Sequence, residues 1–186
     1  MSRIISGLAG SIKLKTAAKS TRPTSDRVKE SLFGKLENLG VLEGAKVLDL
    51  YAGSGALGLE AASRGASEVI LVEKDKAAAE VIKENIRLVS KALGAKPLIT
   101  LQSKEVKKFL GQLAANYDLV FIDPPYELAN SEISENLEAL LQNLERESLV
   151  IVERSSRSED FAWPIGFELE DKKTYGDTAV YVLRFS

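Results

Sequence analysis

Short apolar runs alternate along most of the chain with segments whose apolar residues recur every three or four positions. The runs are typical of buried β-strands and cover residues 46–50, 69–73, 98–102, 118–122 and 148–153. The segments between them have helical spacing and cover residues 56–64, 76–92, 104–115 and about 131–143. Strands that are apolar throughout and alternate with helices are buried on both faces. The pattern therefore predicts an α/β domain, in which a parallel sheet has helices on both faces.

The alternation stops near the carboxyl end. Strand-like runs at 167–174 and 179–184 flank residues 175–178 with no helix between them, so they are expected to pair antiparallel. Together with the five buried runs they make seven strands. We expect a seven-stranded, mostly parallel sheet with one antiparallel strand.

The amino end has a pattern of its own. Residues 3–6 and 12–14 are short strand-like runs around two glycines, which indicates a β-hairpin. A proline and capping hydroxyls precede apolar residues at helical spacing, so residues 25–39 are expected to form an amphipathic helix. We expect residues 1–40 to be an appendage to a main domain of residues 41–186.

The appendage is basic, whereas the rest of the chain is acidic. Residues 1–35 hold eight Lys and Arg residues against two acidic ones, and the remaining residues hold 17 against 25. The formal net charge of −2 hides this asymmetry. Such a distribution is expected for a protein whose partner is a polyanion, RNA or DNA. A basic surface that only faces solvent would give the same count, so charge alone leaves both interpretations open.

The composition excludes several kinds of chemistry. The 186 residues include no Cys and no His, which rules out disulfides, thiolate-bound metal centres, a Cys nucleophile and the Ser-His-Asp triad. We expect no metal. No apolar run approaches the ~20 residues that cross a membrane, and residues 1–7 lack the apolar region of a signal peptide. We expect a soluble, cytoplasmic protein with no membrane partner, and a monomer.

A glycine-rich turn follows the first strand of the alternation and opens its first helix. Gly53, Gly55 and Gly58 have G-x-G-x-x-G spacing, and Glu73 follows Gly53 by 20 residues at the end of the next strand. Such glycines let the backbone approach a ligand, and such an acid binds ribose hydroxyls. A nicotinamide dinucleotide and S-adenosylmethionine both satisfy this arrangement. Asp49 favours the second, because a carboxylate attracts a cationic cofactor and repels a pyrophosphate. The structural alternative is a tight turn that binds nothing.

The segment Asp123-Pro124-Pro125-Tyr126 lies at the carboxyl end of the fourth strand, where ligands bind in open α/β sheets. Its two prolines hold the loop extended. The Asp123 carboxylate and the Pro124 carbonyl can then both accept hydrogen bonds from one exocyclic amine of a base. Tyr126 offers an aromatic face on which that base can stack. The alternative is a strand-ending turn with a packed tyrosine.

These motifs resemble those of a known class of enzymes. Residues 49–60 (DLYAGSGALGLE) and 123–126 (DPPY) resemble the class I, seven-stranded S-adenosylmethionine-dependent methyltransferases that act on exocyclic amines. Residues 3–14 (RIISGLAGSIKL) and 21–33 (TRPTSDRVKESLF) are similar to the RsmD family, which methylates the N2 amine of a guanine in 16S rRNA. The resemblance extends to residues 175–178. It implies a Rossmann-like class I methyltransferase fold.

The resemblance also implies roles for individual residues. S-adenosylmethionine is expected to bind at Asp49, Tyr51, Gly53, Gly55, Glu73, Ser103 and Asp123. The target base is expected to be held for catalysis by Asp123, Pro124 and Tyr126. Contact with RNA phosphates is implied for Arg3, Lys13, Lys15, Arg22 and Arg27.

Two places depart from the pattern of these families. Many class I methyltransferases have an acid after the third strand for the adenine amine, whereas residues 102–105 of this chain read QSKE. Ser103, a backbone group or Glu105 is left for that role. Ser11 and Ile12 stand where the RsmD family usually has basic residues, which weakens the case for RNA contacts at the hairpin.

Three alternatives to an rRNA guanine-N2 methyltransferase remain. An adenine-N6 methyltransferase acting on DNA or RNA would use the same loop at residues 123–126. A nicotinamide-dependent oxidoreductase would use the glycine turn but leaves that loop unexplained, and a non-catalytic RNA-binding module needs neither. The expected partner is 16S rRNA within the small ribosomal subunit. Methyl transfer to a neutral amine needs alignment rather than a strong base, which agrees with the absence of His.

Overall fold

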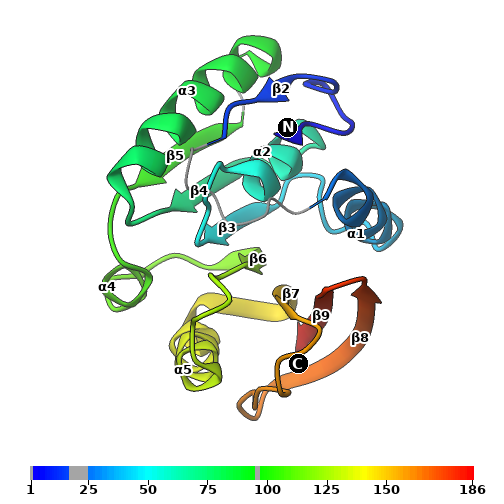
Figure 1. Ribbon diagram of the computed structural model, residues 1–186, viewed down its shortest axis with the longest axis vertical. Helices are drawn as coiled ribbons and strands as arrows, with labels where there is room; N and C mark the ends of the chain where they lie inside the picture. The colour runs from blue at the N-terminus through cyan, green and yellow to red at the C-terminus, as the bar shows by residue number, and fades with distance from the viewer. Residues whose placement is uncertain (1, 17–24, 95–96) are drawn as a thin grey trace.

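A seven-stranded sheet forms the centre of the computed structural model, which describes residues 2–16, 25–94 and 97–186 (Figure 1). In spatial order its strands are β5 (Leu98–Gln102), β4 (Glu68–Val72), β3 (Lys46–Leu50), β6 (Tyr117–Ile122), β7 (Leu144–Ser155), β9 (Thr178–Phe185) and β8 (Phe167–Tyr175). The strands from β5 to β7 are parallel, and β9 lies antiparallel between β7 and β8. The prediction of a mostly parallel sheet with one antiparallel strand is confirmed.

The order of the strands reverses next to β3. From β3 the chain adds β4 and β5 on one side, and it later adds β6 and β7 on the other. In open α/β sheets a crevice forms outside the carboxyl ends of the strands at such a switch point, and ligands bind there. The glycine turn follows β3 and the Asp123–Tyr126 loop follows β6, so both lie at this edge.

Helices cover both faces of the sheet, and each face has its own apolar core (Figure 1). One face packs against α1 (Asp26–Asn38), α2 (Ala56–Ser63) and α3 (Lys76–Leu93). The other packs against α4 (Val106–Leu110), α5 (Asn130–Leu140) and the 3-10 turn η1 (Leu141–Asn143). Successive side chains of a strand point to opposite faces. Val47 therefore belongs to the first core and Leu48 to the second.

The N-terminal segment packs against the same core as the main sheet. β1 (Ser2–Arg3) and β2 (Lys13–Leu14) pair antiparallel, which confirms the hairpin. α1 begins directly after its N-cap residue Ser25, close to the predicted start. Ile4 is buried together with residues of β3 and β4. The division of the chain after residue 40 stays a prediction, since the described residues on both sides of it share one core.

α4 is shorter than the helix predicted at 104–115. It ends at Leu110, and the Nδ2 atom of Asn143 then donates to the carbonyls of Leu113 (3.4 Å) and Ala115 (3.0 Å). These contacts satisfy backbone carbonyls without a helix. The chain therefore turns here and enters β6.

β7 is longer than the strand predicted at 148–153. It runs from Leu144 to Ser155, and the register between β6 and β7 shifts near its start. Glu147 has a left-handed backbone with φ 74°, and such local irregularity is typical of a β-bulge. The charged residues at 145–147 interrupt the apolar pattern, which is why the pattern locates only the later part of the strand.

Candidate active site

The turn between β3 and α2 has a left-handed backbone at three positions. Tyr51, Gly53 and Gly55 have φ values of 64°, 59° and 79°, and glycine adopts such values without strain. A left-handed tyrosine is strained, and strain of this kind clusters at functional sites. The Oε2 atom of Glu73, which follows β4, accepts from the backbone N–H of Gly53 at 2.9 Å. The predicted ribose-binding acid therefore lies against the glycine turn.

Asp49 is a buried carboxyl group beneath this turn. It is 1% exposed, and its Oδ2 atom accepts from the backbone N–H of Gly58 at 2.9 Å. Burial raises the pKa of Asp49 from 3.8 to about 8, and the negative charges of Asp123 and Glu73 act in the same direction. A cation bound near the turn would favour the ionised form of Asp49.

A cavity of about 350 Å³ opens beside the turn. Its wall is built from the turn, the segments that follow β4 and β6, and helices α4 and α5. Five acidic residues and two lysines are part of this wall, and one of the lysines, Lys107, pairs with Glu135 at 3.1 Å. The excess of acidic groups makes the cavity suited to a cationic ligand.

The Tyr51 hydroxyl connects the turn to α5. The Nδ2 atom of Asn136 donates to this hydroxyl at 2.7 Å, and both residues line the cavity. Burial raises the pKa of Tyr51. The hydroxyl therefore stays protonated at neutral pH and keeps a hydrogen that it can donate.

The Asp123–Tyr126 loop forms another part of the cavity wall. Asp123 and Pro125 line the cavity, Pro124 is buried, and Tyr126 is 44% exposed. The backbone N–H of Leu128 donates to the carbonyl of Pro125 at 3.0 Å, which closes a turn after the motif. Asp123 thus contributes to the wall of the cavity, while Tyr126 is partly exposed to solvent.

A residue that the motifs do not reveal holds this loop from β7. Arg154 is 4% exposed, and its Nη2 atom donates to the carbonyl of Leu128 at 2.8 Å and to Oδ1 of Asn130 at 3.0 Å. Burial lowers the pKa of Arg154, but a guanidinium stays charged at neutral pH. The one sequence signal was a cation placed directly after a buried apolar strand.

The structure brings together part of the predicted cofactor site. Four of its residues line the cavity, namely Tyr51, Gly53, Glu73 and Asp123. Asp49 and Gly55 lie behind the cavity wall, in the strand and turn that support it. Ser103 is exposed and is not among the described residues that line the cavity. The segment after β5 contributes Glu105 and Val106 to the wall instead. The role of Ser103 stays a prediction.

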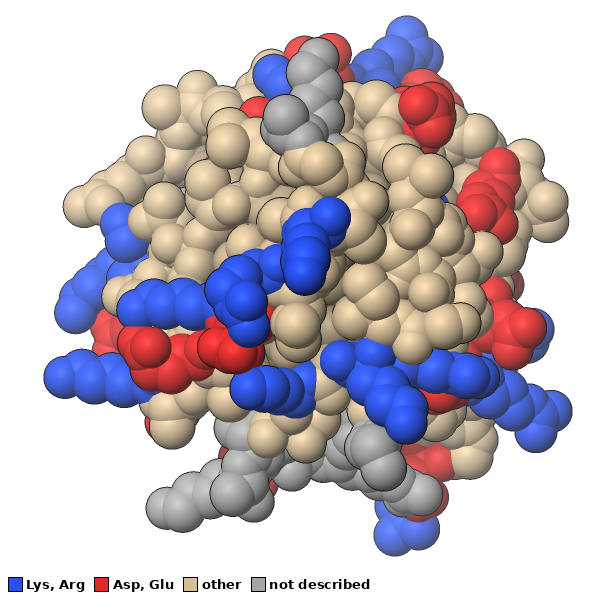
Figure 2. All heavy atoms as spheres, turned by 90° about the horizontal axis from the view of Figure 1, so that it is seen from above, with Lys and Arg blue, Asp and Glu red and all other residues tan. Residues whose placement is uncertain are grey.

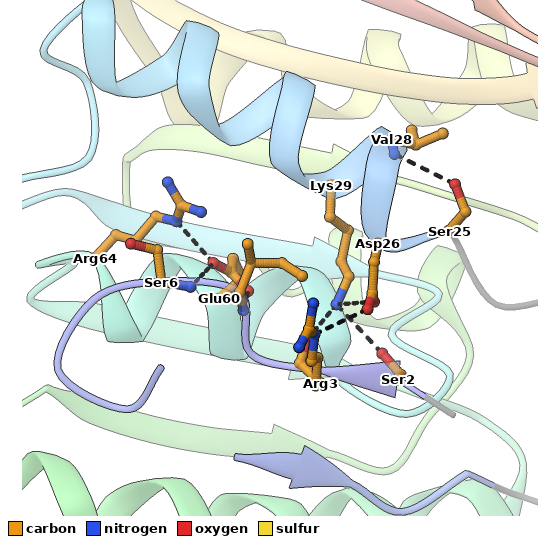
Figure 3. Close-up of polar contacts among 10 residues, drawn as sticks. Ser2, Arg3, Ser6, Ser25, Asp26, Val28, Lys29, Glu60 and Arg64 are labelled. Atoms are coloured by element: carbon orange, nitrogen blue, oxygen red, sulfur yellow. Dashed lines mark hydrogen bonds and ion pairs between the residues drawn. The ribbon is translucent and has the colours of Figure 1, made fainter. Parts of the chain in front are cut away.

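A buried group of charges holds the N-terminal strand on α1 and α2 (Figure 3). Lys29 on α1 is fully buried, and its ammonium group donates to the carbonyl of Arg3. Glu60 on α2 is also fully buried and accepts from the backbone N–H groups of Ile5 (2.6 Å) and Ser6 (3.0 Å). Burial lowers the pKa of Lys29, while the negative charge of Glu60 opposes that shift. Lys29 therefore supports the basic segment from inside and cannot contact a partner.

The residues predicted to contact RNA differ in their surroundings. Arg3 and Lys15 each pair with a carboxylate, at 3.0 Å and 3.2 Å. Lys13 and Arg27 are exposed and form no ion pair with a described residue. Arg22 lies outside the described residues. On the face that lies at the top of Figure 1, Lys and Arg side chains form a band with acidic side chains among them (Figure 2).

Two kinds of feature are absent from the described part of the chain. None of its helices is both long enough and apolar enough to cross a membrane. Its acidic residues do not gather in groups of three or more that could hold a metal ion.

Known proteins resemble the chain over almost its full length. Residues 2–184 match a family model described as conserved hypothetical protein 95. The chain is 35% identical over 160 residues to Ribosomal RNA small subunit methyltransferase D of Escherichia coli (strain K12), a match that covers 85% of this chain and 76% of that protein. The chain belongs to this family, the RsmD methyltransferases.

Other similar proteins agree with this assignment. The RsmD relative of Haemophilus influenzae is 34% identical over 175 residues, which cover 94% of this chain and 89% of that protein. The solved structure of a hypothetical protein from Thermus thermophilus matches with a TM-score of 0.82 and 30% identity, covering 98% of each chain. The class I methyltransferase fold and the RsmD resemblance are therefore confirmed. The roles of single residues in this RsmD protein stay predictions.

Proposed function

We propose that this RsmD protein transfers a methyl group from S-adenosylmethionine to the N2 amine of a guanine in 16S rRNA, within the small ribosomal subunit. The observation that carries the proposal is the Asp123–Tyr126 loop on the wall of an acidic cavity, next to Glu73 and the glycine turn. The relatives from E. coli and H. influenzae bear the name of a small-subunit rRNA methyltransferase. That name does not favour the adenine-N6 alternative.

The residues around the cavity fit S-adenosylmethionine, which supplies an electrophilic methyl group on a sulfonium cation. The wall has more acidic than basic residues, so it attracts a cation. The two carboxylate oxygens of Glu73 accept from the backbone N–H groups of Gly53 (2.9 Å) and Asp75 (2.8 Å). Each oxygen keeps a second lone pair. Glu73 can therefore hold the turn and still accept hydrogen bonds from ribose hydroxyls.

Asp123 and Pro124 are assigned to the amine that receives the methyl group. Two acceptors on one amine draw its hydrogens to one side and leave the nitrogen lone pair directed at the methyl carbon. The new N–C bond forms as the C–S bond breaks, and the nitrogen then carries a positive charge until it releases a proton. The Asp123 carboxylate stabilises that charge electrostatically. Alignment of the two reactants supplies the rest of the acceleration.

Tyr126 is assigned to the ring of the target guanine. The residue is 44% exposed, which leaves its ring accessible to a base that stacks on it. The guanine has to leave its own stack to reach the cavity, which costs a few kcal/mol and least in a loop or single strand. A loop of structured RNA therefore suits this site better than duplex DNA.

The test uses tritiated S-adenosylmethionine and small ribosomal subunits from a strain that lacks the enzyme. After incubation the RNA is digested and its labelled nucleoside is identified. Label in N2-methylguanosine is the expected result, and label in N6-methyladenosine would favour the adenine alternative. A parallel reaction with naked 16S rRNA decides whether the assembled subunit is the substrate. We also propose that the protein acts in the cytoplasm and is a monomer. Light scattering of the purified protein checks the oligomeric state.

A further inference from the structure

Asn85 contacts two segments that have different roles in the proposed function. It lies on α3 and is fully buried. Its Oδ1 atom accepts from the backbone N–H of Lys15 at 2.8 Å, and its Nδ2 atom donates to the carbonyl of Lys15 at 2.9 Å. The same Nδ2 atom donates to the carbonyl of Ser54 at 2.9 Å. An amide nitrogen has two hydrogens, so Asn85 has one for each segment.

The two segments are the proposed cofactor turn and the proposed RNA-binding arm. Ser54 lies between the two glycines of the turn that faces the cavity. Lys15 belongs to the N-terminal arm, a name we use for residues 2–16. The arm carries three of the residues assigned to RNA phosphates, namely Arg3, Lys13 and Lys15. One buried side chain therefore holds both the arm and the turn.

A second route leads from the arm to the same turn through α2. The backbone N–H of Ser6 donates to Oε1 of Glu60 at 3.0 Å, and the backbone N–H of Ala9 donates to Oγ of Ser63 at 2.9 Å. α2 begins directly after Gly55, the last glycine of the turn. The first half of the arm therefore rests on the helix that the turn opens, while Asn85 holds its other end.

We infer that Asn85 is a positioning residue that couples cofactor binding to RNA binding. Because its amide is buried, losing either carbonyl leaves a donor without an acceptor, which is unfavourable. The arm and the turn are then most stable when both keep their present arrangement. A ligand that orders one of them favours the arrangement that the other ligand requires. The inference rests on the proposed function and adds to it a link between its two sites.

The test measures one affinity in the presence and absence of the other ligand. S-adenosylhomocysteine serves as the unreactive probe of the cofactor site, and small ribosomal subunits from a strain lacking the enzyme serve as the RNA. In the wild type we expect each ligand to tighten binding of the other by the same factor, at least about fivefold, because coupling is reciprocal. In Asn85→Leu, which has a similar volume but no hydrogen-bonding group, the factor is expected to fall to about one.

Lys15→Ala is the matched control. It removes the ammonium group and its ion pair with Glu84 (3.2 Å), but it keeps the backbone groups that bond to Asn85. This variant should bind subunits more weakly with and without S-adenosylhomocysteine, and its coupling factor should equal that of the wild type. A measurement on the wild type needs no variant at all: S-adenosylhomocysteine should slow hydrogen exchange at the Lys15 amide.

Three results would overturn the coupling. They are a wild-type factor of one, an unchanged factor in folded Asn85→Leu, and Lys15 exchange that does not respond to S-adenosylhomocysteine. Each of them leaves the proposed function standing as long as the wild type still labels guanine in the subunits. A wild type that binds S-adenosylhomocysteine but labels no nucleoside contradicts the proposed function instead.

Discussion

Asp49 links the stability of the unliganded protein to pH. Its pKa is raised from 3.8 to about 8 by burial, so between these values the folded state keeps a proton that the unfolded state releases. Its contribution to the free energy of unfolding is fully present below about pH 4 and is lost as the pH rises towards 8. In Asp49→Asn this loss disappears, while the amide oxygen can still accept from Gly58. Relative to wild type, the variant should therefore gain stability from pH 5 to pH 8, measured by urea unfolding. A difference between the two proteins that is the same at both pH values contradicts this account.

Asp123 separates catalysis from cofactor binding. Asp123→Ala should lower methyl transfer at least about 100-fold, because an electrostatic contact to the reacting nitrogen is lost. Its affinity for S-adenosylmethionine should stay close to that of wild type, since Glu73 and the glycine turn are unchanged. Calorimetry and the nucleoside assay measure the two quantities. Asp118→Ala is the control, because Asp118 lies at the opposite end of β6 and bonds to the backbone N–H of Lys46. Loss of cofactor binding in Asp123→Ala alone would assign that residue to the cofactor instead.

Residues in motifs were predictable, whereas isolated polar residues were not. Gly53 and Glu73 were both predicted at the cofactor site from the spacing of their motif, and the structure brings them into contact. Asn85 gave no signal, since one asparagine in an amphipathic helix has the same pattern as a solvated one. Its partners, Lys15 and Ser54, lie 70 and 31 positions away in the sequence. Arg154 was not predicted either, because its partners Leu128 and Asn130 lie 26 and 24 positions away in the sequence. Only the folded chain shows what such residues contact.

Helix α2 owes its position to a glycine at its contact with β4. A Cβ atom on Gly58 would lie 2.3 Å from Cδ2 of Leu71 and 3.0 Å from Cγ1 of Val69. Gly58→Ala should therefore destabilise the protein by about 1–3 kcal/mol through overpacking. Gly34→Ala on α1 is the matched change, because nothing lies within 4 Å of a Cβ there. Alanine is the better helix former, so Gly34→Ala should stabilise by up to about 1 kcal/mol. Thermal unfolding measures both, and two shifts of the same sign would refute the argument.

At the scale of elements, the apolar pattern located the middle of each helix and strand better than its ends. Four of the five buried runs and the long helix α3 were found to within a residue because their burial is continuous or strictly periodic. α4 was overestimated because the backbone N–H groups of Gln112 and Leu113 donate to the carbonyls three positions earlier (3.0 and 3.1 Å), which forms tight turns in place of further α-helix. β7 was underestimated because its first residues are mostly charged and include the left-handed Glu147. In both places the backbone hydrogen bonds decide where the element begins or ends, and the apolar pattern does not record them.

For the whole molecule, the count of basic residues overstates the surface available to RNA. Lys29 is fully buried, and Lys35 pairs with Asp171 at 2.7 Å. Lys13 and Arg27 are exposed and form no ion pair with a described residue, so the predicted RNA contacts of these two residues stay possible. Charge counted along a sequence says nothing of which cations the fold neutralises.

This distinction predicts how salt acts on binding to the ribosomal subunit. Each phosphate contact by a lysine contributes about 1 to the slope of log K against log salt concentration. Lys13→Gln should lower that slope by about 1, because its ammonium group has no carboxylate partner among the described residues to return to when RNA leaves. Lys15→Gln should lower it less, since Lys15 exchanges one anion, Glu84 at 3.2 Å, for another.

Arg146→Gln is the control, because Arg146 lies at the start of β7, at the edge of the sheet opposite the cavity. Filter binding over a series of salt concentrations measures the three slopes. If the substitutions at Lys13 and Lys15 lower the slope equally, ion pairs within the protein do not reduce the contribution of a lysine to RNA binding. If the substitution at Arg146 also lowers the slope, the RNA-binding face lies elsewhere.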